Sequence, residues 1–349
     1  MTVFLHGLAT ALPPHELPQD LVQTRAQALL GPHYPQFERL SRTFTTAGIE
    51  RRYSVVPIDW FEADHGWKDR NDVYLDGATA LFMDAAGKAL AASGWTAPEV
   101  DCIVTVSSTG IATPTLESRV AAQMGFRDDV LRVPVFGLGC AGGASGLTIA
   151  QRLSAARPDD RVLLVVVEAC TPSFRTDRLQ KADIIATVLF GDGAAAACLS
   201  GRRAESGIEV GTGTQITWPD TLGIMGWDVD DIGLGVVFDR SIPDFVSTNL
   251  ESAVSGALER CGLTLDEVDR FVCHPGGAKV ITAIERVLHL DQGTLAEERE
   301  VLRDAGNMSA PTILFVLERV LQGGASGTLM GVALGPGFTG SFVPLRVAA

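Results

Sequence analysis

The sequence predicts an α/β protein built from two duplicated halves. Helix and strand patterns alternate along the 349 residues, which is typical of sheets covered by crossover helices. Residues 161–167 form a continuous apolar run, as expected for a strand that helices cover on both faces. Residues 89–101 also recur, with the same spacing of shared residue types, as residues 257–269. Together these observations favour mostly parallel sheets with helices on both faces.

The repeat extends beyond this first match. In each copy a helix end and a turn precede a strand, at residues 103–106 and 271–273. Further along, Cys140 follows a glycine at the start of one expected helix, and Asn307 follows a glycine at the start of the corresponding one. Duplicated halves related by a pseudo-twofold axis bring corresponding positions together near that axis. We therefore expect Cys140 and Asn307 to approach each other.

The boundary between the two halves is expected near Gly201, where a glycine- and charge-rich link begins. The first half then spans residues 1–201 and carries the cysteine, and the second half spans residues 202–349 and carries the asparagine. Residues 1 to about 80 hold an entry segment and insertions that the second half lacks.

The composition excludes several classes of protein. Hydrophobic residues make up 46% of the chain and charged residues 20%, which suits a large core and excludes disorder. The net charge of −14 argues against a nucleic-acid partner. No apolar run is long enough for an integral membrane segment, and the N-terminus lacks a signal-peptide pattern. The six cysteines form no CxxC pairs, so we expect reduced thiols, no metal site and a cytoplasmic location.

Cys140 is the candidate nucleophile. A strand-like run and a glycine turn precede it, and the small residues 141–146 continue the helix that it begins. A thiol at a helix N-terminus experiences a positive partial charge, which favours the thiolate. The neighbouring glycines let a ligand approach the backbone closely. The alternative for one cysteine in a glycine-rich turn is a buried structural residue.

His274 and Asn307 are the candidate partners of this cysteine. His274 lies where a strand ends, which is where α/β proteins place their ligands, and the other histidines do not. Asn307 carries a neutral amide that can donate to a developing oxyanion. Taken singly, a histidine is more often a packed or surface residue, and an asparagine is more often a helix cap.

Taken together, the three segments resemble the condensing enzymes of the thiolase superfamily, and in particular the chalcone-synthase-like type III polyketide synthases. The resemblance spans residues 47–342 and includes the Gly-Asn-Met-Ser run at 306–309. Residues 189–194 and 334–339 also match, although residues 333–334 depart from the family's Gly-Phe-Gly-Pro-Gly loop. The resemblance implies a five-layered αβαβα thiolase-like fold, a homodimer, and an acyltransferase that needs no cofactor besides its CoA thioester substrates.

The resemblance also implies a role for each candidate. Cys140 would accept a starter acyl group from CoA, and His274 would keep its thiolate ionised. His274 and Asn307 would donate to the thioester carbonyl of malonyl-CoA while CO2 leaves. The enolate formed in this way would attack the thioester on Cys140. Phe190 would stand at the junction of the CoA tunnel and the cavity.

Further positions are assigned to substrate binding by the same resemblance. Trp227 falls near a position that is usually glycine, and Val236 replaces a second gatekeeping phenylalanine, which would widen the passage. Small or polar side chains at three positions would open a tunnel for a long alkyl chain, as in bacterial alkylpyrone and alkylresorcinol synthases. These positions are Thr113, Cys170 and Ser173, of which the first replaces a methionine that crosses the dimer interface in plant relatives. The remaining assigned residues are Ser309 and, around the cyclisation pocket, Gly335, Pro336 and Gly337.

CoA binding requires a local basic cluster on this acidic chain. Arg39 and Arg42 align with the family's basic entry positions, whereas a third such position holds Thr46. Gly276 and Gly277, in the turn after the histidine, are also assigned to CoA. The alternative for the two arginines is a solvated helix face.

The predicted function is therefore a type III polyketide synthase with acyl-CoA and malonyl-CoA as substrates. We expect a fatty acyl starter, two or three extensions, and cyclisation to an alkylpyrone or alkylresorcinol. One alternative is a ketoacyl synthase III-like or pyrone-forming enzyme that performs a single condensation. The others are a cysteine-dependent acyl-CoA hydrolase, which forms no carbon–carbon bond, and a catalytically inactive binding module.

Overall fold

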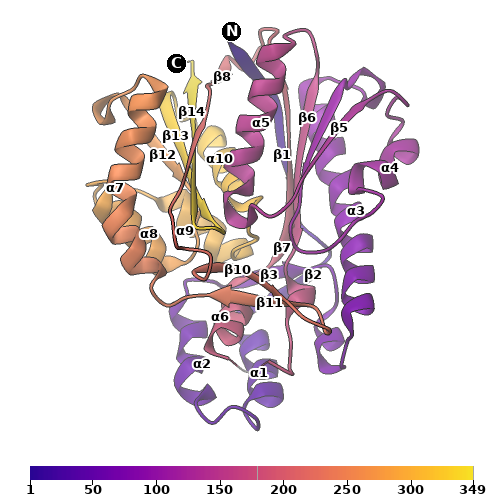
Figure 1. Cartoon of the computed structure of the whole chain (residues 1–349), viewed down its shortest axis with the longest axis vertical. Helices are drawn as coiled ribbons and strands as arrows, with labels where there is room; N and C mark the ends of the chain where they lie inside the picture. The colour runs from indigo at the N-terminus through magenta and orange to yellow at the C-terminus, as the bar shows by residue number, and fades with distance from the viewer. Residues whose placement is uncertain (179, 349) are drawn as a thin grey trace.

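The computed structural model describes residues 1–178 and 180–348. The chain begins with the entry segment and the first three α-helices (Figure 1). Their elements are β1 (Val3–Ala11), β2 (His15–Pro18), α1 (Gln19–Leu30), α2 (Phe37–Thr46), β3 (Arg51–Ser54), the short 3-10 turn η1 (Ile58–Glu62) and α3 (Trp67–Ser93). The hairpin of α1 and α2 projects from one end of the molecule, away from both chain termini (Figure 1).

The rest of the first half alternates between strands and helices, as expected. Its elements are η2 (Ala97–Glu99), β4 (Cys102–Val106), α4 (Leu116–Met124), β5 (Leu131–Val135), η3 (Gly139–Ala141), α5 (Gly142–Ala156), β6 (Val162–Ala169), η4 (Thr171–Ser173), α6 (Lys181–Leu189) and β7 (Asp192–Ser200). Every residue of β6 and β7 is buried, because helices cover both of their faces.

The second half begins with short strands and then follows the same plan. Its elements are β8 (Ile208–Val210), β9 (Thr214–Thr217), β10 (Met225–Val229), β11 (Leu234–Phe238), α7 (Ile242–Cys261), η5 (Leu265–Glu267), β12 (Arg270–Cys273), α8 (Ala278–Val287), α9 (Ala296–Ala305), α10 (Thr312–Gln322), β13 (Gly327–Gly335) and β14 (Thr339–Val347).

The main sheet is mixed rather than mostly parallel. Its order is β12-β13-β14-β8-β1-β7-β6-β4-β5, with β9 pairing with β14. The pairs β4/β5, β4/β6 and β12/β13 are parallel, whereas β6/β7, β1/β7 and β13/β14 are antiparallel. The expectation of mostly parallel sheets was wrong because each half ends in an antiparallel strand. The strand β8 pairs with both β1 and β14, so the two halves form one continuous sheet.

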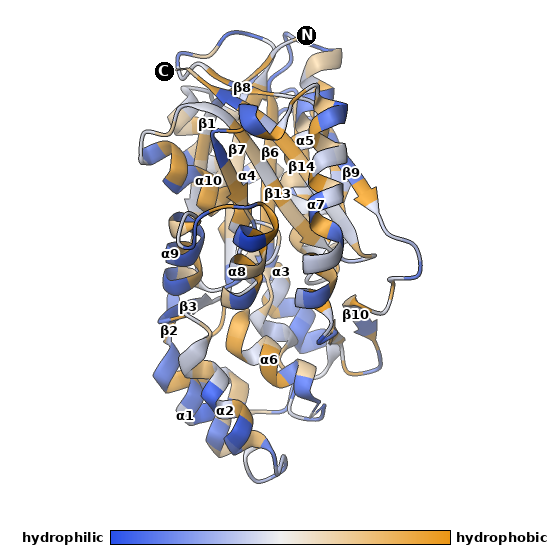
Figure 2. Ribbon diagram, turned by 90° about the vertical axis from the view of Figure 1, so that its left-hand side faces the viewer, coloured by the Kyte–Doolittle hydropathy of each residue, from blue (hydrophilic) through white to orange (hydrophobic). Residues whose placement is uncertain are grey.

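The layers follow from this topology. The buried helices α5 and α10 contact each other and contact strands of both halves, so they form the central layer. On one outer face α3 packs against β1, β6 and β7, and on the other α7 packs against β9 and β14. Apolar residues concentrate in the strands and in the central layer, and the outer helices turn polar faces to solvent (Figure 2). This arrangement is the thiolase-like αβαβα fold.

The sequence repeat is visible in the local geometry. Both α3 and α7 end at a glycine in the left-handed conformation, and each is followed by a threonine–glutamate capping box. In the two boxes, Thr96 N–H donates to Glu99 at 2.8 Å, and Thr264 N–H donates to Glu267 at 2.7 Å. Equivalent residues therefore form equivalent turns in the two halves.

Candidate active site

Cys140 lies in the short turn η3 that leads directly into α5, so its expected place at the start of a helix is confirmed. Its side chain is only 5% exposed, and its thiol donates to Ser309 Oγ at 3.5 Å. The β13–β14 hairpin holds this turn in place. A Cβ atom at Gly335 would lie 2.5 Å from the carbonyl oxygen of Leu138 and 2.6 Å from the nitrogen of Ala141, so only glycine fits there.

His274 directly follows β12, at the strand end where the sequence places it. Its backbone N–H donates to the carbonyl oxygen of Val332 at 2.8 Å, which fixes the residue beside β13. The imidazole is buried, and neither ring nitrogen has a hydrogen-bond partner among the described residues. Both nitrogens are therefore available to groups that enter the site.

Asn307 is not at the start of a helix, because α10 begins five positions later, at Thr312. It instead forms an isolated parallel bridge with Phe190. Its Oδ1 accepts from Ser309 N–H at 2.8 Å, and its Nδ2 donates to the carbonyl oxygen of Gly276 at 3.4 Å. These bonds orient the amide, so helix capping does not account for this residue.

One cavity joins the three residues. Cys140, His274 and Asn307 line one pocket, which measures about 450 Å³ out to the surrounding solvent, although 167 positions separate the first and the last (307 − 140). Its remaining walls are Gly276 and apolar side chains: Met225, Phe238, Ile242, Val280, Ile284, Val332, Leu334 and Phe338. The convergence that the duplicated halves predict is thus present.

Burial favours the neutral forms of the cysteine and the histidine. It raises the pKa of the Cys140 thiol to about 11, against the opposing effect of hydrogen bonds from Ser309 and Asn307. It also lowers the pKa of the His274 imidazole to about 3. The role of His274 in keeping the Cys140 thiolate ionised stays a prediction from the sequence.

Glu168 is a buried carboxyl group near this site that the sequence reasoning did not single out. Its Oε2 accepts from Ser108 N–H at 2.9 Å and from Thr109 Oγ1 at 2.8 Å, and its Oε1 has no partner among the described residues. Burial raises the pKa of Glu168 to about 7, and its charge contributes to the raised pKa of Cys140. The sequence feature that could have identified Glu168 is its place as the single carboxylate in an otherwise apolar strand.

A second, larger cavity contains five of the ten residues assigned to substrate binding. The space between its walls, out to the surrounding solvent, is about 750 Å³, and it is lined by Phe190, Cys170, Ser173, Trp227 and Val236. Most of its other walls are apolar: Leu17, Val22, Ala26, Leu29, Ile58, Phe61, Phe174 and Ala186. The pKa of the Cys170 thiol is raised well above its usual value, mainly by burial and then by the charges of Glu168, Asp192 and Cys140.

Phe190 stands between the two cavities, and its partner is Phe238 rather than residue 236. The two rings meet edge to face with their centroids 6.4 Å apart. Val236 and Phe238 are two positions apart in β11, so they share one face of the strand. Val236, which the resemblance assigns to a gatekeeping position, lines the larger cavity, whereas Phe238 lines the smaller one.

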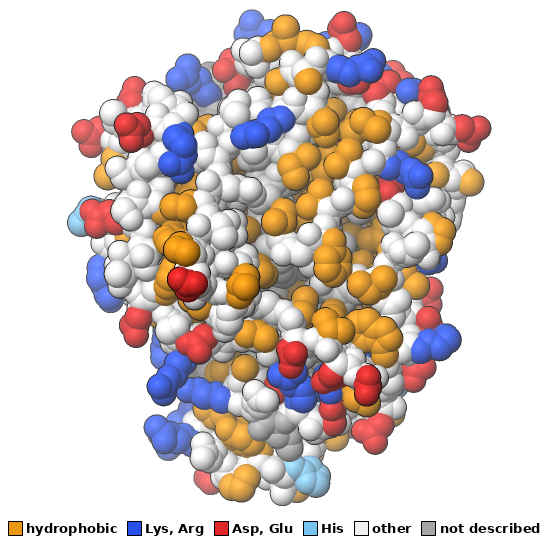
Figure 3. Space-filling view, in the orientation of Figure 1, with side chains coloured by type: hydrophobic (Ala, Val, Ile, Leu, Met, Phe, Trp, Pro, Cys, Tyr) orange, Lys and Arg blue, Asp and Glu red, His pale blue; other side chains and the backbone are white. Residues whose placement is uncertain are grey.

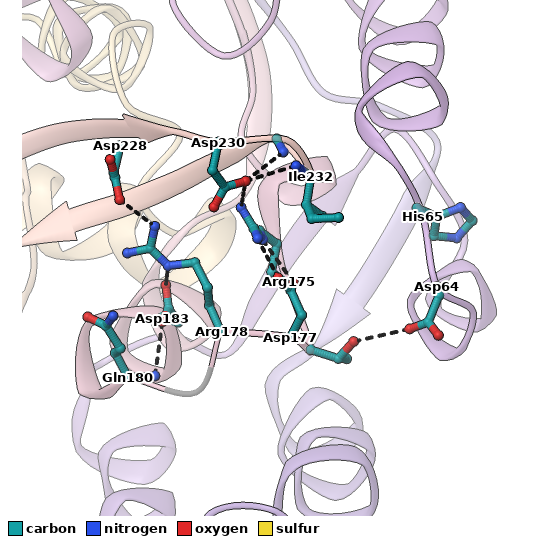
Figure 4. A network of polar contacts seen from close by, with 12 residues as sticks. Asp64, His65, Arg175, Asp177, Arg178, Gln180, Asp183, Asp228, Asp230 and Ile232 are labelled. Carbon is teal, nitrogen blue, oxygen red and sulfur yellow. Dashed lines mark hydrogen bonds and ion pairs between the residues drawn. The ribbon is translucent and has the colours of Figure 1, made fainter.

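The β10–β11 hairpin forms part of the wall of the larger cavity, and ion pairs connect it to residues 175–178 (Figure 4). Arg175, which is buried, pairs with Asp177 and with Asp230 of the hairpin, the latter at 2.7 Å. Arg178 pairs with Asp228 at 3.0 Å and lies 3.9 Å from Asp183 in α6. The hairpin carries Trp227, whose indole N–H donates to the carbonyl oxygen of Ser108 at 2.9 Å. This wall is thus held by polar contacts at both of its faces.

Two groups of assigned residues lie outside these cavities. Thr113 is exposed on the loop between β4 and α4, and it lines neither cavity within one chain. Gly335, Pro336 and Gly337 form the turn that packs on the nucleophile, while their neighbours in the hairpin line the smaller cavity. Gly335 and Pro336 pack on the cysteine turn, and the role of this segment in shaping the cyclisation pocket stays a prediction.

The residues assigned to CoA are divided between the surface and the smaller cavity. Arg39 and Arg42 are exposed on α2, and basic side chains gather at this end of the molecule (Figure 3). Gly276 lines the smaller cavity, and Gly277 precedes α8. Within the described residues, no cluster of histidine, cysteine or carboxylate side chains could hold a metal ion. In the same part of the chain, no helix is both long and apolar enough to cross a membrane.

Comparison with solved structures confirms the class of protein that this fold and site define. The 1,3,6,8-tetrahydroxynaphthalene synthase of Streptomyces coelicolor A3(2), a bacterial type III polyketide synthase, superposes with a TM-score of 0.93 at 25% sequence identity. The match covers 99% of each chain. The structure is thus that of a thiolase-like condensing enzyme.

Comparison with sequences gives the family. Residues 4–202 match the N-terminal domain of chalcone and stilbene synthases, and residues 209–347 match their C-terminal domain. A 1,3,6,8-tetrahydroxynaphthalene synthase of Streptomyces peucetius subsp. caesius is 39% identical over 97% of this chain and 91% of its own length. The α-pyrone synthesis polyketide synthase-like Pks18 of Mycobacterium tuberculosis is 28% identical over 96% and 88%.

The chain belongs to the chalcone and stilbene synthase family and is a type III polyketide synthase. Enzymes of this family are condensing acyltransferases that use CoA thioesters and malonyl-CoA, with no further cofactor. This identification is preferred over the three alternative hypotheses, which were a single-condensation enzyme, a hydrolase and an inactive binding module.

Proposed function

We propose that the enzyme loads a fatty acyl group from CoA onto Cys140 and extends it with two or three malonyl units. The product would be an alkylpyrone or alkylresorcinol. The observation that carries this proposal is the larger cavity, whose walls are mostly apolar and include Phe190, the residue that forms the bridge with Asn307. Burial of apolar surface is the main force available for binding an alkyl chain, at about 0.8 kcal/mol per CH2 group. Cys170 and Ser173 keep the inner end of the cavity wide enough for it.

The proposed loading step moves one acyl group and one proton. The sulfur of Cys140 attacks the thioester carbon of the acyl-CoA, and the thiol proton passes to His274. The bond from the carbonyl carbon to the CoA sulfur then breaks, and the CoA thiolate takes the proton from His274. The imidazole is available for this transfer because neither of its ring nitrogens has a hydrogen-bond partner among the described residues.

The extension step is proposed to depend on Asn307 and His274 as donors. Malonyl-CoA loses CO2 and leaves an enolate whose oxygen accepts hydrogen bonds from Asn307 Nδ2 and from the His274 ring. The enolate carbon attacks the acyl carbonyl on Cys140, the carbon–sulfur bond breaks, and the thiolate is released. The bond of Asn307 to Gly276 supports this role, because at 3.4 Å it is long and can be exchanged for a ligand oxygen.

A second candidate uses malonyl-CoA for both starter and extender and forms a naphthalene. It is favoured by the relative at 39% identity, whose name is 1,3,6,8-tetrahydroxynaphthalene synthase. The two candidates differ in the first acyl group, so mass spectrometry of products separates them. Malonyl-CoA alone should yield little product, and adding long-chain acyl-CoA should yield alkyl-substituted rings. A tetrahydroxynaphthalene from malonyl-CoA alone, unaffected by acyl-CoA, would refute the alkyl proposal.

We also infer that the enzyme is a homodimer. The strand β5 lies at the edge of the sheet and is largely exposed, with Leu131 at 55% and the following Phe136 at 59%. An exposed edge with large apolar side chains favours pairing with a second copy. Thr113 lies exposed in the loop that follows β4, the strand next to β5. Analytical ultracentrifugation should give twice the mass of one chain, and a monomer at micromolar concentration would contradict the inference.

The basic residues of α2 are proposed to bind the CoA phosphates. Arg39 and Arg42 are exposed and lie one turn apart, so both can reach one anionic ligand. Charge reversal of both residues should raise the KM for acyl-CoA and leave kcat nearly unchanged. A cytoplasmic location stays a prediction from the sequence.

A further inference from the structure

Arg52 is a buried arginine that lies between Phe190 and the loop that carries Asn307. It stands in β3 and is 3% exposed. Its Nη1 donates to the carbonyl oxygen of Phe190 at 2.6 Å, and its Nε donates to Gln19 Oε1 at 3.1 Å. Gln19 is itself fixed, because its Nε2 donates to the carbonyl oxygen of Val188 at 3.0 Å. The guanidinium group is therefore connected to the Phe190 carbonyl directly and to the Val188 carbonyl through Gln19.

The same side chain lies against the segment that leads to Asn307. A Cβ atom at Gly306 would be 2.6 Å from Arg52 Cγ, so the arginine stem occupies the space beside this glycine. The positive φ of 69° at Gly306 turns the chain at this point. Directly afterwards, Asn307 N–H donates to the carbonyl oxygen of Leu189 at 2.9 Å. Arg52 thus contacts both segments that form the bridge, the one that contains Phe190 and the one that contains Asn307.

The buried positive charge of Arg52 is not expected to stabilise the fold. Burial lowers the pKa of Arg52 to about 10, so the group still carries its proton at neutral pH. The buried carboxylate of Asp192 opposes this lowering, but no carboxylate among the described residues forms an ion pair with Arg52, and its Nη2 has no hydrogen-bond partner there. A buried charge without these partners is costly, and buried donors that serve the fold alone are normally satisfied. The residue also lines the larger cavity, so it belongs to the surroundings of the reaction.

We propose that Arg52 is a positioning residue that holds Phe190 and Asn307 in one fixed arrangement for the decarboxylation of malonyl-CoA. It acts through the backbone: the bond to the Phe190 carbonyl and the packing on Gly306 fix the bridge from both sides. The Asn307 amide is thereby kept in line with the enolate oxygen, and the Phe190 ring is kept at the boundary of the cavities. The inference rests on the role proposed above for Asn307.

The test measures the two half-reactions separately in Arg52→Met. Release of CO2 from malonyl-CoA reports on Asn307, and acylation of Cys140 by a starter reports on the nucleophile. Because a donor displaced by about 1 Å loses much of its effect, decarboxylation should fall by about tenfold or more. Acylation should stay within about threefold, since η3 does not touch Arg52. Arg52→Lys should restore part of the decarboxylation, because an ammonium group can still donate to the Phe190 carbonyl.

Two further variants complete the experiment. Gln19→Ala removes the acceptor of Nε, so it should reduce decarboxylation in the same direction but less. Arg161→Met, which removes an arginine that pairs with Glu99 far from both cavities, is the matched control and should change neither half-reaction. Equal loss of both half-reactions in Arg52→Lys and Gln19→Ala, or no loss in any Arg52 variant, would overturn the inference. Native enzyme that releases no CO2 would instead contradict the proposed function.

Discussion

The ring of Phe190 meets the ring of Phe238 edge to face, with 6.4 Å between their centroids. Phe190 lines the larger cavity and Phe238 lines the smaller one that contains Cys140, so this pair forms the boundary between the two spaces. A chain that grows on the cysteine must pass this boundary to enter the larger cavity. The pair is therefore the first place to test how the enzyme selects its starter.

Replacing Phe238 by alanine should widen the boundary and favour bulkier starters. We expect the ratio of kcat/KM for long-chain over short-chain acyl-CoA to rise by about tenfold, since differences of a few methylene groups have effects of this size in apolar pockets. The measurement is steady-state kinetics over a series of acyl-CoA chain lengths. Phe126→Ala, at a buried phenylalanine in the core beside α3, is the control and should leave the ratio unchanged.

Filling the inner end of the larger cavity should have the opposite effect. Cys170→Leu adds volume where the alkyl chain is proposed to lie, so long-chain starters should lose about tenfold in kcat/KM while short ones are retained. Product analysis should also show fewer long-chain products. The matched control is Cys261→Leu, because this cysteine is only partly buried and lines neither of the two cavities. Unchanged selectivity in Cys170→Leu would place the alkyl chain elsewhere.

Removal of the Asn307 amide should separate the two half-reactions. In Asn307→Ala the enolate oxygen loses a donor, and decarboxylation of malonyl-CoA should fall by about 100-fold. Acylation of Cys140 should be nearly unaffected, because the asparagine takes no part in the proton transfer to His274. Mass spectrometry of the intact protein detects the acyl group, and CO2 release reports decarboxylation. Loss of acylation to the same extent would contradict the assigned role.

The role of His274 can be tested through the pH dependence of thiol alkylation. Burial raises the pKa of Cys140 to about 11, so without a base the thiolate is scarce at neutral pH and increases about tenfold per pH unit. In His274→Ala, alkylation by iodoacetamide should therefore be slow at pH 7 and should rise steeply up to pH 10. In the native enzyme the imidazole accepts the proton, so alkylation at pH 7 should be faster by about tenfold or more.

The comparison is made at several values of pH on folded protein, as judged by circular dichroism. His6→Ala, at a histidine within β1 that lines neither of the two cavities, is the control for loss of an imidazole and should alkylate like the native enzyme. Equal rates in the native enzyme and in His274→Ala at every pH would show that His274 does not receive the thiol proton.

Local sequence signals predicted much of this site. The glycine turn before Cys140, the strand end at His274 and the duplicated helix–turn–strand segments all depend on residues close together in the chain. Such patterns predict structure well because residues close together in the sequence determine the backbone conformation of turns and strand ends. The resemblance to type III polyketide synthases depends on these same segments, and the comparisons confirm it.

Other features could not be predicted in this way. The place of Asn307 is set by a bridge to Phe190, not by helix capping, and no local pattern marks a single pair of bonded residues so far apart. The partner of Phe190 is set by the register of β10 and β11, which decides the face on which Phe238 lies. The unpaired charge of Arg52 depends on three segments that pack around it.

The sequence by itself determined that a cysteine, a histidine and an asparagine occupy turns of two duplicated α/β halves, because turn and strand signals are local. The repeat also predicted that Cys140 and Asn307 approach each other. Only the tertiary structure decided that a buried carboxyl group lies near them, and that a mostly apolar space lies beside Phe190. The physical reason is that shared cavities, raised pKa values and enclosed apolar volume arise from the packing of distant segments. They therefore exist only once the halves have joined through β8 and the central helices.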